Sequence, residues 1–127
     1  MIKNSFKKDF DLISRITKFE HIYDKEKIPC VILLDKSIIR CIKNFSGKPH
    51  YKANPSKYFS YGQLLHGIRK QLVDIGPEMG LFLYVDNKLP TMTSLLYQDY
   101  PLYKDPEDGF LYLHLYAENT FGCETKV

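Results

Sequence analysis

The sequence has few cysteines and no long apolar run, and both absences limit its class. Its three cysteines, Cys30, Cys41 and Cys123, are odd in number and widely spaced. They fit neither a disulfide framework nor a zinc site, and they favour a reducing, cytoplasmic environment. No segment approaches the ~20 apolar residues that span a bilayer, and the first residues lack the apolar core of a signal peptide. Any membrane attachment is therefore expected to be covalent or to come through a partner.

Patterns that carry catalysis or bind metal are also missing. The four histidines show no metal-ligand spacing, and no acid, base and nucleophile are grouped in the sequence. The segment from Asp105 to Gly109 lacks the alternating ligands and the distal glutamate of a calcium loop. We therefore expect no catalytic residues, no metal and no cofactor.

The charge is unevenly distributed along a chain of single-domain length. The 127 residues carry a net charge of +3 and are 44% hydrophobic, which is enough to form a core. Residues 1–72 hold 15 basic and 6 acidic side chains, giving +9, whereas residues 73–127 hold 3 and 9, giving −6. A basic face suits acidic partners, but no nucleic-acid-binding motif accompanies the charge, so nucleic acid is not expected as a partner.

The hydrophobic pattern predicts an α+β domain. Asp9 is the expected cap of the first helix, and Ser60 with Gln63 forms a capping box for the second. Residues 38–45 alternate loosely between apolar and charged side chains, which favours an edge strand, and residues 46–59 are expected to form a long loop. The predicted helices cover residues 9–23, 60–72 and 93–100, and the predicted strands cover 28–34, 38–45, 81–85 and 109–116.

The end of the chain combines a strand with a polar tail. Residues 109–116 are aromatic and branched without interruption, which is typical of a strand buried on both faces. The residues that follow have no apolar face and are expected to be flexible. Phe121 and Gly122 stand out there, because a glycine without a Cβ can enter a narrow slot of another protein. This arrangement resembles the precursor of a ubiquitin-like modifier with a propeptide at 123–127.

Several short motifs, in order, resemble the autophagy ubiquitin-like modifiers of the microtubule-associated-protein light-chain and GABA-receptor-associated-protein type. They are Lys27-Ile28-Pro29-Cys30-Val31-Ile32, Gly62-Gln63 with Ile68-Arg69-Lys70, Leu81 to Asn87, Leu96-Tyr97-Gln98-Asp99, Asp108 to Tyr112, and Thr120-Phe121-Gly122. The resemblance implies a ubiquitin-like β-grasp at 28–116 with an N-terminal helical extension at 1–27. A conjugation tail at 117–122 and a propeptide at 123–127 would follow.

The resemblance also implies a life cycle for the tail. A cysteine protease would cut after Gly122, with Phe121 beside the cut. Activating and conjugating enzymes of autophagy would then join the new carboxylate to the amine of phosphatidylethanolamine. The protein would be cytoplasmic, and bound to the autophagosome membrane once lipidated.

Family members bind cargo receptors through aromatic-x-x-aliphatic motifs, which add a strand to the sheet edge. By position, the resemblance implies two pockets and one basic contact on the edge strand. The aromatic pocket would use Ile22, Pro29, Val31 and Phe110, the aliphatic pocket Leu64 and Ile68, and the basic contact Lys43. Gly67 stands where the family usually has a bulky aliphatic residue.

Two alternatives remain open. The apolar residues among these also fit an ordinary core, because an apolar stripe usually faces the interior. The second alternative concerns function: the protein would be a β-grasp module that binds peptides and is never conjugated. For Arg69, a salt bridge to the sheet is favoured over a solvated charge.

Overall fold

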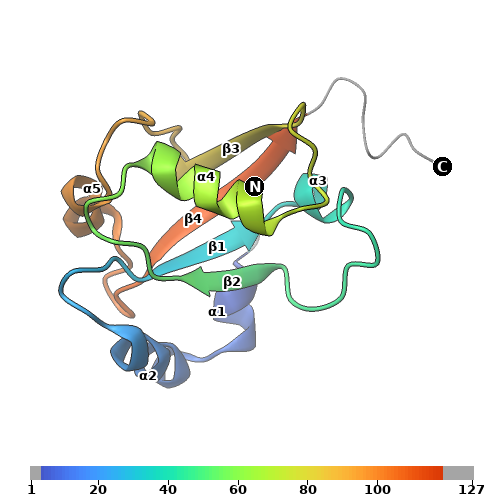
Figure 1. Cartoon of the computed structure of the whole chain (residues 1–127). Helices are drawn as coiled ribbons and strands as arrows, with labels where there is room; N and C mark the ends of the chain where they lie inside the picture. The colour runs from blue at the N-terminus through green and yellow to red at the C-terminus, as the bar shows by residue number, and fades with distance from the viewer. Residues whose placement is uncertain (1–3, 119–127) are drawn as a thin grey trace.

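The computed structural model describes residues 4–118, which form five helices and one mixed sheet of four strands (Figure 1). The helices are α1 Ser5–Asp9, α2 Leu12–Ile22, α3 Lys36–Ile39, α4 Tyr61–Gln71 and α5 Leu96–Tyr103. The strands are β1 Cys30–Leu34, β2 His50–Ala53, β3 Gly80–Val85 and β4 Leu111–Glu118.

The last strand lies in the middle of the sheet. The strand order is β2-β1-β4-β3, with β4 parallel to β1 and antiparallel to β3, and β2 antiparallel to β1. After β2, the chain crosses one face of the sheet through α4 and reaches the opposite edge as β3 (Figure 1). The edges of the sheet are therefore β2 and β3.

Helices cover both faces of the sheet. Alternate residues of a strand point to opposite faces, so Cys30 and Ile32 of β1 join the larger core, which includes α4 and the buried residues of β3. Val31 and Leu33 point the other way and join a smaller cluster with α1 and α2. Figure 1 shows α4 on one side of the sheet and α1 and α2 on the other.

The N-terminal segment departs from the predicted single helix over 9–23. Asp9 ends α1, and Asp11 caps α2 by accepting a hydrogen bond from the Ser14 amide at 2.9 Å. Both aspartates lie before the apolar stripe, and the second is in the extended conformation that a cap requires. The break lets Phe6 and Phe10 pack on the sheet beside α2.

The predicted strand over 38–45 is wrong. Asp35 caps α3 by accepting bonds from the backbone amide and the hydroxyl of Ser37, and Ile38 and Cys41 point inward at helical spacing. The second strand lies later, at His50–Ala53, within the segment predicted to be a loop. Only four residues long and close to Pro49 and Pro55, this strand gives little periodic signal.

The C-terminal half agrees better with the pattern. The capping box of Ser60 and Gln63 is present at the start of α4, and β3 lies where expected. Helix α5 begins and ends three residues later than predicted, because a bridge between Ser60 and Leu95 keeps the preceding segment extended. Strand β4 continues to Glu118, two residues further than expected. The prediction that it is buried on both faces is wrong, because its residues alternate between buried and partly exposed.

Candidate functional site

Strand β2 presents a free edge of the sheet, because its only strand neighbour within residues 4–118 is β1. Tyr51 and Ala53 pack toward α4 against the larger core. His50 and Lys52 lie opposite Leu33 and Val31, on the face that carries α1 and α2. A strand added along β2 would therefore have one pocket region on each side.

The residues predicted for the aromatic pocket do come together beside α2. Phe110 is fully buried next to Val31, its ring centroid lying 5.4 Å from Phe6 and 5.7 Å from Phe19. Ile22 is partly exposed and packs against this cluster. Pro29 is buried, and its carbonyl accepts a hydrogen bond from Leu111 that ties the entry of β1 to β4. Val31 and Phe110 thus form a floor.

The end of α2 is attached to the end of β2. The side-chain amide of Asn54 donates a 2.9 Å hydrogen bond to the carbonyl of Ile22. The side-chain carbonyl oxygen of Asn54 is buried without a partner among the described residues. This link fixes the distance between the α2 end and the free edge.

The residues predicted for the aliphatic pocket lie on the opposite face of the sheet. Leu64 and Ile68 are 6% and 3% exposed and belong to the larger core. Gly67 faces open space, since a Cβ built on it meets no atom within 4 Å. Arg69 lies on the opposite flank of α4, where its guanidinium donates to the carbonyls of Gly76 and Met79 at 3.1 and 2.8 Å. Arg69 therefore has a structural contact, but with backbone carbonyls rather than the predicted salt bridge.

Lys43 does not lie on the edge strand. It belongs to the turn after α3, where its backbone N–H donates to a carboxylate oxygen of Asp74 at 3.2 Å. Its assignment to a peptide depended on the predicted strand over 38–45, which the structure replaces with α3 and turns. The basic residue on the edge strand is Lys52, which is exposed and which the sequence pattern missed.

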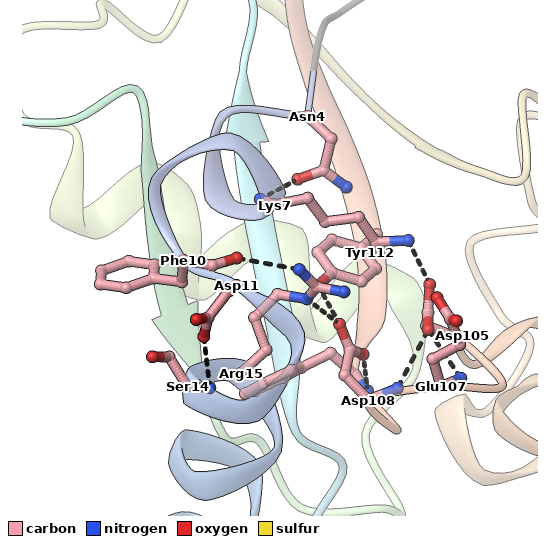
Figure 2. Close-up of polar contacts among 11 residues, drawn as sticks. Asn4, Lys7, Phe10, Asp11, Ser14, Arg15, Asp105, Glu107, Asp108 and Tyr112 are labelled. Atoms are coloured by element: carbon pink, nitrogen blue, oxygen red, sulfur yellow. Dashed lines mark hydrogen bonds and ion pairs between the residues drawn. The ribbon is translucent and has the colours of Figure 1, made fainter.

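A buried polar network holds the N-terminal helices on the sheet (Figure 2). Arg15 of α2 donates from Nε to the Asp108 carboxylate at 2.8 Å and from a terminal nitrogen to the Phe10 carbonyl. The same carboxylate accepts bonds from the Tyr112 hydroxyl and the Phe110 amide, at 2.6 and 2.9 Å. Arg15 and Asp108 are only 7% and 2% exposed. The backbone of Phe110, in the predicted aromatic pocket, is therefore hydrogen-bonded to an enclosed ion pair.

Burial and pairing shift the pKa values in this network. Burial and the bond to Asp108 raise the pKa of the Tyr112 hydroxyl. Burial opposes the charge on Arg15, yet the bond to Asp108 raises its pKa above the ordinary value. Asp105 pairs with Lys7, which keeps the pKa of Asp105 low despite partial burial. Sequence reasoning missed this network, although Arg15 shares a helix face with Phe19 and Ile22 at spacings of four and seven.

Two further observations concern residues 4–118. None of the helices in this range is long and apolar enough to cross a bilayer. Nor does this range contain three or more histidine, cysteine or acidic side chains grouped as metal ligands. Phe121 and Gly122 lie beyond the described residues, as do the predicted propeptide and most of the predicted tail.

The arrangement of the sheet and its helices defines the class of fold. A mixed four-stranded sheet crossed by one helix, with two helices added at the N-terminus, is a ubiquitin-like α+β fold with a helical extension. The crystal structure of ATG8 from Trypanosoma brucei has the same fold. It matches with a TM-score of 0.74 at 22% identity and covers 94% of this chain and 99% of that one.

Sequence comparisons identify the family. The family model described as "Autophagy protein Atg8 ubiquitin like" matches residues 14–122. Autophagy-related protein 8 of Schizosaccharomyces pombe is 36% identical over 124 residues, covering 95% of this chain and 96% of that protein. The protein of the same name from Dictyostelium discoideum is 32% identical over 123 residues, covering 95% and 96%. The chain belongs to the Atg8 family of autophagy ubiquitin-like modifiers.

Proposed function

We propose that this protein is cleaved after Gly122 and conjugated through that glycine to phosphatidylethanolamine. The observation that supports this proposal is that the family match ends at residue 122, at the glycine of the Phe-Gly pair. The central strand β4 ends at Glu118, so the glycine follows a strand held on both sides. The described residues that form the sheet and the two cores all precede Gly122.

In this reaction the modifier supplies a carboxylate and its partner enzymes supply the catalytic groups. A cysteine protease hydrolyses the peptide bond after Gly122, and the activating enzyme adenylates the freed carboxylate with ATP, releasing pyrophosphate. A carrier cysteine then displaces AMP to form a thioester, which passes to a second carrier cysteine, and the lipid amine displaces that thiol to form the amide. The two acyl chains of the lipid suffice for stable anchoring at the autophagosome membrane. Lipid attachment also fits the finding that none of the helices within residues 4–118 is suited to cross a bilayer.

The second part of the proposal is that cargo receptors add a strand to β2. The strand has one neighbour, so its outer N–H and C=O groups can pair with an aromatic-x-x-aliphatic peptide. On one side, Ile22, Pro29, Val31 and Phe110 would receive the aromatic side chain. On the other side, Leu64 and Ile68 would receive the aliphatic one, with open space at Gly67. Lys52 would attract an acidic flank of the peptide.

The intact mass of the protein from a eukaryotic cell tests conjugation. We expect the chain to lose residues 123–127 and then gain one phospholipid. Gly122→Ala should block both steps without changing the thermal midpoint, because a methyl group must fit the slot of the protease. Phe121→Ala should slow the cleavage step without changing the thermal midpoint. Normal processing of Gly122→Ala would contradict the proposal, and an unmodified full-length chain would favour the unconjugated peptide-binding module.

A further inference from the structure

A hollow lies on the part of the sheet that the N-terminal helices leave open. Helices α1 and α2 pack on side chains of β1 and the start of β4, and the cluster they form includes no residue of β3. Beyond them, β3 and the second half of β4 line a cavity of about 800 Å³. Its walls include Phe82 and Tyr84 of β3 and His114 and Tyr116 of β4.

Strand register forms these walls. Phe82 lies opposite Tyr116 and Tyr84 lies opposite His114, so four rings stand on one face of neighbouring strands. The rings of Tyr84 and Tyr116 meet edge to face, with centroids 5.3 Å apart and planes 77° apart. All four side chains are partly exposed rather than buried. Two nearly perpendicular ring planes therefore form a corner that opens to solvent.

Within the described part of the chain, the one carboxylate on the wall of the hollow belongs to Glu118, whose side chain is exposed. Burial lowers the pKa of His114, which favours the neutral form of its ring at pH 7. The Nδ1 atom of this ring is buried and has no hydrogen-bond partner among residues 4–118.

We propose that this hollow, defined by Phe82, Tyr84, His114, Tyr116 and Glu118, binds a quaternary ammonium group such as that of choline or trimethyl-lysine. A methylated cation is attracted to ring faces by their quadrupoles. It has no N–H groups that bind water, so removing it from water costs less than removing a primary ammonium. Several rings with a carboxylate beside them suit this ligand better than a neutral apolar group. The site is independent of the β2 edge and of processing at Gly122.

Titration of the full-length protein with tetramethylammonium, followed by NMR, tests the proposal at matched ionic strength. We expect saturable shifts at the backbone amides of β3 and β4. Choline should bind, and its neutral carbon isostere 3,3-dimethylbutan-1-ol should bind about tenfold more weakly, as expected for a cation–π contribution. Equal binding of the isostere, or the absence of a saturable shift, would overturn the proposal.

Substitutions locate the site and control for folding. Tyr116→Leu and Tyr84→Leu keep apolar area but remove a ring face, so each should weaken choline binding by about tenfold. Glu118→Gln should weaken it less, because the carboxylate is exposed. Tyr97→Leu is the matched control, since Tyr97 is 43% exposed on α5, outside the cavity. An equal loss with Tyr97→Leu would contradict the site.

Two further ligands identify the source of the group. Phosphocholine represents a lipid headgroup, and N-acetyl-trimethyl-lysine amide represents a modified protein. The carboxylate of Glu118 should disfavour phosphate, so we expect the lysine derivative to bind more tightly. Tighter binding of either ligand supports the cation site and names its source, whereas failure of both would overturn it.

Discussion

Replacing Asp108 should release the N-terminal helices from the sheet. The carboxylate accepts bonds from Arg15, Tyr112 and the Phe110 amide, and both charged groups of the pair are enclosed. Asp108→Asn leaves the Arg15 guanidinium without a counter-charge. Breaking one side of a buried pair costs about 3–5 kcal/mol, because the remaining charge stays desolvated. For a domain of this size, that corresponds to a fall in Tm of about 10–20 °C.

A double-mutant cycle separates the ion pair from general disruption. Arg15→Met keeps the length of the side chain and should cost a similar amount, because it strands the Asp108 carboxylate. The double variant Arg15→Met/Asp108→Asn should cost clearly less than the sum of the single changes, since no buried charge remains unpaired. Urea denaturation with an unchanged m-value measures each free energy of unfolding.

A surface pair provides the matched control. Lys57 and Glu26 are 2.8 Å apart, but their side chains are 29% and 53% exposed. Glu26→Gln should leave the denaturation midpoint unchanged, because water replaces the lost partner. Additive losses in the cycle, or an effect of Asp108→Asn no larger than that of Glu26→Gln, would refute the reasoning.

Three further outcomes follow from the structure. Burial lowers the pKa of His50 and His114 below 6.5 in the folded protein, so the unfolded chain binds more protons. The free energy of unfolding should therefore fall as the pH drops through 6.5. Denaturation midpoints that stay constant down to pH 5 would contradict this. Gly109→Ala should destabilise the fold by about 1–3 kcal/mol, because φ is +85° and the new Cβ would lie 2.8 Å from Phe19; an unchanged Tm would show that the turn adapts. A peptide with an acidic run before Trp-x-x-Leu should shift the NMR signals of Lys52 and bind more weakly at high salt, and calorimetry should show a larger loss for Trp→Ala than for Leu→Ala; equal losses would mean that the aliphatic pocket is complete despite Gly67.

Local signals predicted the elements whose start and hydrophobic stripe coincide in the sequence. Helix α4 is the best example, because Ser60 and Gln63 mark its start while Leu64 and Ile68 mark its buried face. The failure at residues 38–45 has a physical reason. Asp35 and Ser37 form a cap that converts the apolar run into a short helix, and loose alternation does not distinguish that helix from a strand.

The candidate site was only partly accessible to sequence reasoning. Val31 and Phe110 were correctly placed near Ile22, because the family resemblance carries their positions. The correct edge strand was missed, because four residues do not establish a period. The bond between Arg15 and Asp108 joins residues 93 positions apart, and only the folded chain brings them together.

The central position of β4 has a consequence for how the chain folds. In the register, Cys30 lies beside Leu111, and β1 and β3 each pair with β4 but not with one another. Until β4 arrives, β1 and β3 present unpaired inner edges, which are sites of misassembly. The chain between β1 and β4 must close into a long loop before these strands can pair. Folding should therefore be slow relative to a helical bundle of the same size. Stopped-flow refolding with a truncation before residue 111 measures this dependence, and we expect the truncated chain to form no stable sheet.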